Sequence, residues 1–232
     1  EEDNKKPGAE KKSVAFFSLE MSAEQLASRI LSAKAQVPGH LMRSGKITDE
    51  QFDELAAGVS LLSKLPLYLD ETPGITVTAI KNRARRMKRD KDKGLGLIVI
   101  DYLQLITTAG RSENRVQELS EMTRQLKIMA KELKVPVIAC AQLSRGTEAK
   151  GKSHRPALSD LRESGSIEQD ADIVLFLYRE TYYDNEKTDD EDRGDPNKAE
   201  CIVAKNRHGE LGTVDLHWDG QFTRFTSVEV FR

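Results

Sequence analysis

Residues 97–101 read Leu-Ile-Val-Ile-Asp, and this short run decides the fold class. A continuous apolar run rich in β-branched residues is typical of a strand buried on both faces of a parallel sheet. Further buried strands are predicted at 14–19 and 135–141, a short strand at 67–70 and an apolar strand at 173–178. Amphipathic patterns between these runs predict helices near 23–35, 49–64 and 114–134, and a basic helix follows Thr-Pro-Gly at 72–74.

The last part of the chain changes pattern. Shorter strands are predicted at 199–205, 213–217 and 222–225, and Asp219-Gly220 is a strong signal for a hairpin turn. Alternating strands and helices followed by such a β-meander predict an α/β fold. We expect a mostly parallel sheet flanked by helices and extended by C-terminal antiparallel strands.

Length and composition narrow the class of protein. The 232 residues, 38% hydrophobic and 32% charged with a net charge of −2, suit one large globular domain and no membrane span. We expect a flexible segment at 1–12 and a domain at 13–232. Cys140 and Cys201 sit in apolar runs and are predicted to be reduced core residues of a cytoplasmic protein, not disulfide or zinc ligands.

Two carboxylates end predicted strands. Asp101 closes the 97–101 run, and Glu20 follows the 14–19 run. Ligands in open α/β sheets bind at the carboxyl ends of strands, where Asp101 could hold Mg²⁺ through water and Glu20 could polarise an attacking water. The alternatives are that Asp101 caps a turn and that Glu20 only complements a helix dipole.

Polar groups follow two further strands. Gln142 comes after the 135–141 run and could sense a phosphate, although a solvated loop residue is the simpler alternative. Lys205 and Arg207 end a late strand, and their donors suit a γ-phosphate. Because that strand is expected far from Asp101, we expect these two cations to act across a subunit boundary, unless they form an exposed cationic hairpin.

A small-residue loop contains Arg162, Glu163 and Gly165 and precedes a capping-box pattern at 166–169. Such a loop could bind a nucleic-acid backbone phosphate, or could simply cap a helix. The basic stretch 81–93 is better explained as a solvated helix face, because Asp90 and Asp92 interrupt its charge.

Five motifs together closely resemble the C-terminal motor domain of bacterial replicative DNA helicases of the DnaB type. They are Ser-Leu-Glu-Met-Ser at 18–22, Ile-Val-Ile-Asp-Tyr-Leu-Gln-Leu at 98–105, Gln-Leu-Ser-Arg at 142–145, Ser-Asp-Leu-Arg-Glu-Ser-Gly-Ser-Ile-Glu-Gln-Asp-Ala-Asp at 159–172 and Lys-Asn-Arg-His-Gly at 205–209. The resemblance runs from about Ser13 to near the end. It implies a RecA-like fold, a homohexameric ring, and ATP-driven movement on single-stranded DNA that parts the duplex.

The resemblance also implies residue roles. Glu20 matches the family's catalytic glutamate, Asp101 its Mg²⁺-linked Walker B aspartate, and Gln142 its γ-phosphate sensor. Lys205 and Arg207 match the pair that reaches the neighbouring subunit's nucleotide. Arg162, Glu163 and Gly165 match the loop that holds DNA in the central channel, and 110–114 would be a second channel-facing element. Primase and a helicase loader are implied as partners of the parent protein.

One motif of the family is absent from its expected position. The family's Walker A loop, G-x-x-x-x-G-K-[ST], should precede Val14, where the sequence offers only Gly8. Without that loop no backbone cradle holds the phosphates, so we expect this chain alone to bind ATP weakly and to be inactive. The alternatives are a RecA-like recombinase, a signalling ATPase, or a non-catalytic assembly module.

Overall fold

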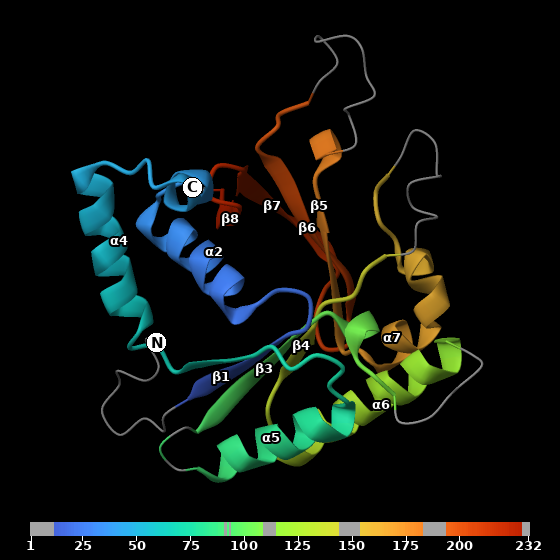
Figure 1. The fold of residues 1–232 in the computed structure, drawn as a ribbon. Coiled ribbons are helices and arrows are strands. Elements are labelled where there is room, and N and C mark those ends of the chain that lie inside the picture. The colour runs from blue at the N-terminus through green and yellow to red at the C-terminus, as the bar shows by residue number, and fades with distance from the viewer. Residues whose placement is uncertain are drawn as a thin grey trace.

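The computed structural model describes residues 12–90, 92, 94–108, 115–143, 154–182 and 194–228, without the side chains of 162–164. These residues build two four-stranded sheets with helices around them (Figure 1). The predicted α/β, RecA-like class is confirmed. The predicted flexible segment at 1–12 lies, apart from residue 12, outside the described residues.

The first sheet is parallel and has the strand order β2-β1-β3-β4. Its strands are β1 (Ser13–Ser18), β2 (Leu67–Asp70), β3 (Leu95–Asp101) and β4 (Val137–Ala139). All four were predicted, although β4 is shorter than the apolar run at 135–141 that predicted it.

The helices that accompany this sheet begin at local sequence signals. In α2 (Ala23–Ala35) and α4 (Asp49–Leu62), Ser22 and Thr48 form capping boxes with glutamines three residues on. Helix α5 (Val77–Arg89) and helix α6 (Arg115–Leu133) match the remaining predictions. The short helix α3 (Gly39–Ser44) was not predicted, and it ends at Gly45, whose φ of 68° suits glycine.

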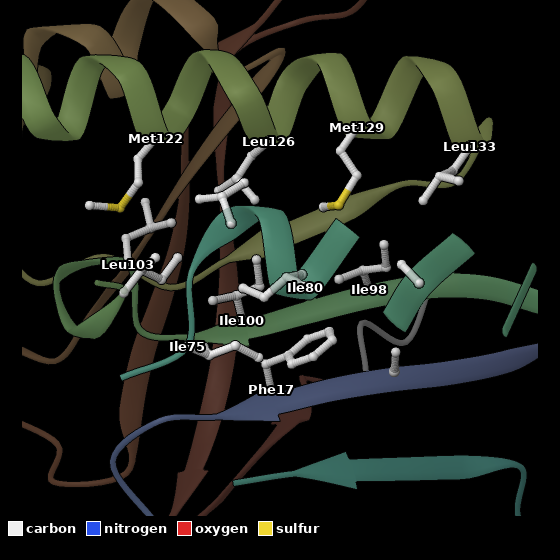
Figure 2. Packing of buried hydrophobic residues seen from close by; sticks show 14 of the residues in the cluster. Phe17, Ile75, Ile80, Ile98, Ile100, Leu103, Met122, Leu126, Met129 and Leu133 are labelled. Atoms are coloured by element: carbon white, nitrogen blue, oxygen red, sulfur yellow. The ribbon is translucent and has the colours of Figure 1, made fainter. Parts of the chain in front are cut away.

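The main core lies where α5 and α6 cover one face of this sheet (Figure 2). Ile98 and Ile100 of β3 are fully buried there, and Phe17 of β1 lies beside them. Met122 and Met129 project from α6 toward these strands. The i, i+3, i+4 spacing of apolar residues in α6 therefore marks the face that packs on the sheet.

The second sheet is antiparallel, with the order β5-β6-β7-β8. Its strands are β5 (Ile173–Tyr178), β6 (Lys198–Asn206), β7 (Gly212–Asp219) and β8 (Arg224–Ser227). A 3-10 helix (Leu158–Ser164) and α7 (Gly165–Asp170) precede β5, and two further 3-10 turns lie at Leu103–Leu105 and Glu180–Tyr182. The sheet is thus separate from the parallel one, whereas the sequence predicted a single extended sheet.

Strand β5, predicted as an apolar strand, buries only one of its faces. Val174 and Phe176 are buried against Leu161, but Leu175 is 55% and Leu177 60% exposed on the other face. Ile138 of β4 is similarly 53% exposed. Within the described residues, β4 pairs only with β3 and β5 only with β6, so an apolar edge and face stay uncovered.

Two smaller predictions were wrong. Cys140, which follows the end of β4, is exposed, and Cys201 of β6 is half-buried, so neither is a core residue. Strand β8 begins at Arg224 and not at 222, because β7 continues to Asp219, which pairs with Arg224, so the turn lies at 220–223 instead of 218–221.

Candidate nucleotide site and cationic cluster

The carboxyl ends of β1, β3 and β4 form one edge of the parallel sheet, which we call the carboxyl edge. Ser18 lies opposite Asp101, and Ile100 lies opposite Ala139. Glu20 follows the end of β1 by two residues, and Gln142 follows the end of β4 by three. The structure therefore brings Glu20, Asp101 and Gln142 to the same edge.

Backbone hydrogen bonds continue past the strand ends and hold this edge together. The Leu19 N–H donates to the Asp101 carbonyl at 2.7 Å, and the Cys140 N–H donates to the Ile100 carbonyl at 2.9 Å. The segments that carry Glu20 and Gln142 are thus tied to β3. Rigid strand ends are what a site needs in order to hold side chains in fixed positions.

The thiol of Cys140 contacts Asp101. Partial burial raises the pKa of this thiol, and the Asp101 charge and a hydrogen bond to Asp101 raise the pKa further. A raised pKa favours the protonated thiol, which is the form that can donate to the carboxylate. Asp101 is half-buried, so it keeps access to solvent beside this contact.

Gln104 clamps the backbone of Gln142 from both sides. Its Nε2 donates to the Gln142 carbonyl at 3.1 Å, and its Oε1 accepts from the Gln142 N–H at 3.4 Å. Arg115 in turn donates to the Gln104 carbonyl at 2.6 Å. Sequence reasoning missed Gln104, although a polar residue between Leu103 and Leu105 was a usable signal.

The donor set at the carboxyl edge fits a magnesium ion held through water. Mg²⁺ prefers oxygen ligands and keeps several waters, so one or two carboxylates suffice. Asp101 and the exposed Glu20 supply carboxylate oxygens, and Gln142 supplies an amide. The described residues contain no group of three or more His, Cys, Asp or Glu that would form a closed metal cage.

Asp70 is a further carboxylate at the end of β2, opposite Phe17, but its oxygens are already engaged. Arg83 binds one oxygen, and Thr72 donates to the other from its hydroxyl at 2.7 Å and its N–H at 3.1 Å. Burial raises the pKa of Asp70, and the hydrogen bonds of Arg83 and Thr72 outweigh it, so the pKa is lowered overall. Asp70 is therefore a structural group.

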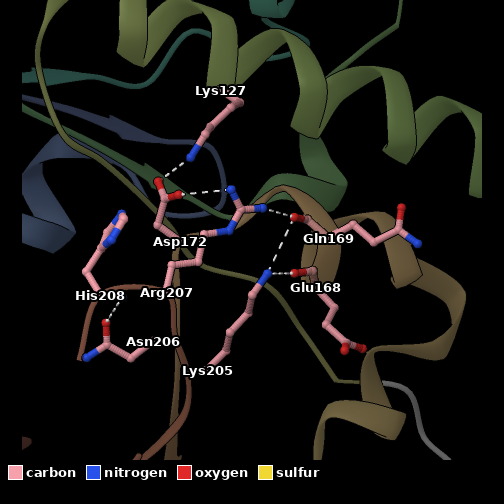
Figure 3. Close-up of polar contacts among 8 residues, drawn as sticks. All are labelled: Lys127, Glu168, Gln169, Asp172, Lys205, Asn206, Arg207 and His208. Carbon is pink, nitrogen blue, oxygen red and sulfur yellow. Dashed lines mark hydrogen bonds and ion pairs between the residues drawn. The ribbon is translucent and has the colours of Figure 1, made fainter. Parts of the chain in front are cut away.

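Lys205 and Arg207 lie at the end of β6, in the second sheet, and both contact the C-terminus of α7 (Figure 3). The Lys205 ammonium donates to the Glu168 carbonyl and, at 3.4 Å, to the Gln169 carbonyl. The Arg207 guanidinium donates to the Gln169 carbonyl at 2.6 Å. Cations satisfy free carbonyls at a helix C-terminus and complement its dipole.

Asp172 completes this cationic cluster. Its carboxylate binds the Lys127 ammonium of α6 through one oxygen and lies 3.5 Å from Arg207 through the other. The Lys127 hydrogen bond lowers the pKa of Asp172, and the charges of Arg207 and His208 lower it further. Sequence reasoning assigned no role to Asp172 or Lys127, because only the fold brings these two residues together.

The segment predicted as a DNA-binding loop is helical. Arg162 and Glu163 lie in the 3-10 helix Leu158–Ser164, which leads directly into α7 at Gly165. The capping box predicted at 166–169 is therefore wrong, because α7 begins before Ser166. The side chains of Arg162 and Glu163, and the whole predicted element at 110–114, lie outside the described residues.

A formal Walker A match that sequence reasoning overlooked occurs at 146–153, Gly-Thr-Glu-Ala-Lys-Gly-Lys-Ser. These residues lie outside the described part of the chain. A working phosphate loop leads directly into a helix, whose first N–H groups bind phosphate. Residues 154–157, which follow the match, are not helical, so the helix that this motif requires does not follow it.

Comparisons with known proteins identify the family of this chain. The family described as DnaB-like helicase C terminal domain matches residues 3–227. The replicative DNA helicase DnaC of Bacillus subtilis is 50% identical over 218 residues, which cover 94% of this chain and 46% of the relative. The replicative DNA helicase DnaB of Rickettsia typhi is 46% identical over 239 residues, covering 97% and 47%.

Similar solved structures also include a DnaB-like replicative helicase. One solved structure, described as an ATPase domain, superimposes with a TM-score of 0.85 at 36% identity, covering 94% of this chain and 75% of that one. A DnaB-like replicative helicase, described together with its interactions with primase, gives the same TM-score and identity but is covered over only 51%. The described residues contain no helix long and apolar enough to cross a membrane.

The chain spans about half the length of the curated relatives that it matches. The match to the family nevertheless covers nearly all of this chain, including the carboxyl edge and the cationic cluster. This chain belongs to the DnaB-like helicase C-terminal domain family.

Proposed function

We propose that this chain is the ATP-hydrolysing motor of a ring-shaped replicative helicase that moves along single-stranded DNA and unwinds duplex DNA. The observation that carries the proposal is the meeting of Glu20, Asp101 and Gln142 at the carboxyl edge of one parallel sheet. Ligands of open α/β sheets bind at this edge. Family membership supports the helicase reaction.

Each side chain at the edge has a distinct task in this proposal. Asp101 holds the waters of a bound magnesium ion, which would supply positive charge to the phosphates. Glu20 accepts a proton from the attacking water, and its exposed position gives water access. Gln142 senses the γ-phosphate with its amide, and Gln104 fixes the backbone from which this amide extends.

Lys205 and Arg207 act in the site of a neighbouring subunit. Both belong to the second sheet, whereas the carboxyl edge belongs to the first. A guanidinium that arrives from another subunit can stabilise charge that develops on the γ-phosphate. This role requires an oligomer, and we propose a homohexamer with single-stranded DNA in its channel, near Arg162, Glu163 and Gly165.

Primase and a helicase loader are proposed partners of the whole protein.

The uncovered apolar surface supports the expectation that these 232 residues alone bind ATP weakly. The edges of β4 and β5 each lack a second neighbour among the described residues, and Ile138, Leu175 and Leu177 are exposed. A further strand and helix, carrying the phosphate loop, would pair with these edges and bury these side chains. We propose that a segment of the whole protein outside these residues supplies them.

The proposal is tested by Glu20→Gln in the full-length protein, with Glu24→Gln on α2 as a matched control. Loss of a general base costs about 10²–10⁴-fold in rate, so ATP hydrolysis and unwinding should nearly vanish while ATP binding persists. Glu24→Gln should leave all three activities unchanged. Normal hydrolysis by Glu20→Gln would contradict the proposed role of the carboxyl edge.

A further inference from the structure

Asp172 occupies the point where three separate elements of the cationic cluster meet. It follows α7 and immediately precedes β5, and it faces Lys127 of α6 and Arg207 at the end of β6 (Figure 3). Three cations, Lys127, Lys205 and Arg207, gather at this place. A single carboxylate between Lys127 and Arg207 offsets their mutual repulsion.

The contacts restrain Arg207 at both its backbone and its side chain. The Arg207 N–H donates to the Asp172 carbonyl at 2.9 Å, and one guanidinium nitrogen lies 3.5 Å from the Asp172 carboxylate. A second guanidinium nitrogen donates to the Gln169 carbonyl at 2.6 Å. The orientation of the guanidinium plane is therefore set, while the side chain stays 44% exposed.

The carboxylate is itself held in place. Its other oxygen binds the Lys127 ammonium, which extends from the long helix α6. Helix α6 packs on the main core through Met122, Leu126 and Met129, so Lys127 stands on a helix that is anchored to the core. The chain of contacts from α6 through Asp172 to Arg207 thus ties an exposed cation to a rigid core.

We propose that Asp172 is a positioning residue for Arg207, and that Lys127 fixes Asp172 for this task. The inference rests on the proposed function, in which Arg207 reaches the nucleotide of a neighbouring subunit. An arginine that is already oriented loses less side-chain freedom when it engages a phosphate, so more of the interaction stabilises the transition state. Exposed ion pairs contribute little to folding stability, so the effect falls on rate and not on stability.

The test uses the full-length protein and measures ATP hydrolysis in the presence of single-stranded DNA. Asp172→Asn should lower kcat by roughly tenfold, the size expected from losing one charge-assisted hydrogen bond, with KM for ATP and Tm nearly unchanged. Asp172→Glu should restore part of kcat. Lys127→Met should lower kcat in the same way, and Lys131→Gln, one turn further along α6, should not.

The double variant Lys127→Met/Asp172→Asn should be no slower than the slower single variant, because both substitutions break the same chain of contacts. Wild-type kcat in Asp172→Asn, or fully additive effects in the double variant, would overturn the inference. The variant Arg207→Ala, measured alongside, distinguishes failure of the positioning role of Asp172 from failure of the proposed role of Arg207. If Arg207→Ala is inactive and Asp172→Asn is normal, only the positioning role fails, and if Arg207→Ala is normal, the proposed role of Arg207 fails too.

Discussion

Strands β3 and β5 are equally apolar in sequence but differ in burial. Each strand buries one face, with Ile98 and Ile100 in β3 and with Val174 and Phe176 in β5. The other face is half-buried in β3, at Leu97 and Val99, and more than half exposed in β5, at Leu175 and Leu177. Strand β3 lies between β1 and β4 under α5 and α6, whereas β5 lies at the edge of its sheet and is covered on one face. An apolar run thus predicts a strand, but the cover of its two faces depends on elements elsewhere.

The two sheets also carry opposite charges at the ends where the candidate site residues lie. The parallel sheet presents Glu20 and Asp101 at its carboxyl edge, and the antiparallel sheet presents Lys205 and Arg207 at the end of β6. A phosphate that binds a magnesium ion needs both kinds of group. The separation favours a site that two subunits complete together, and the following predictions test this division.

The largest expected effect is that of Arg207→Ala in the full-length protein. Loss of an arginine that stabilises charge on the γ-phosphate typically costs about 10³–10⁵-fold in rate, so ATP hydrolysis should vanish. Binding of a fluorescent ATP analogue should be retained, because the carboxyl edge is intact. Arg124→Ala, an exposed change on α6, serves as the control, and equal rates for the two variants would contradict the role of Arg207.

The next effect distinguishes the two strands by stability. Ile100→Ala should lower the free energy of unfolding by about 2–5 kcal/mol, because it leaves a cavity in the main core. Leu175→Ala in the same 232 residues should cost less than about 1 kcal/mol, since its side chain is 55% exposed. Urea denaturation followed by circular dichroism measures both.

The cost of Leu175→Ala can also be compared between the full-length protein and these 232 residues. If a further strand and helix cover β5, Leu175→Ala should be more destabilising there than in these 232 residues. An equal cost in both proteins would show that the exposed face of β5 stays open.

A smaller effect concerns pH and Asp70. Its pKa is lowered below 3.8 in the folded protein, so its contribution to stability is present above that value and is lost as the pH falls through the lowered pKa. The Tm difference between wild type and Asp70→Asn should therefore shrink as the pH falls below about 3.8. A difference that stays constant with pH would show that the charge of Asp70 is not responsible.

The smallest expected effect is none at all. Lys152→Ala alters the formal Walker A match at 146–153, which the required helix does not follow. ATP affinity of the full-length protein should stay within about twofold of wild type. A large loss of affinity would place the phosphate loop at 146–153.

Local signals in the sequence predicted much of the fold. The capping box of Ser22 and Gln25 marked the start of α2 because both of its hydrogen bonds lie within four residues. The start of β8 was missed because the position of the turn depends on how β7 and β8 pair, and Asp219 pairs with Arg224. The exposure of Leu175 was missed for a similar reason, since it depends on which elements cover β5.

The residues of the candidate site also differ in whether the sequence could predict them. Glu20, Asp101 and Gln142 could be named from the sequence, because each follows a strand that an apolar run predicts. Gln104 was missed although its place between two leucines was a signal, and Asp172 could not be named, because its partner Lys127 is 45 positions away in the chain. Residues that position others are thus harder to predict than residues at strand ends.

The central claim is that one subunit supplies the carboxyl edge and its neighbour supplies the cations. Subunit mixing tests it most directly: full-length Asp101→Asn and Arg207→Ala proteins, each inactive alone, are mixed, allowed to exchange subunits and assayed for ATP hydrolysis. The account predicts that activity returns to about a quarter of wild type, because one interface in four pairs an intact edge with an intact Arg207. Exchanged mixtures that stay as inactive as their components would contradict it.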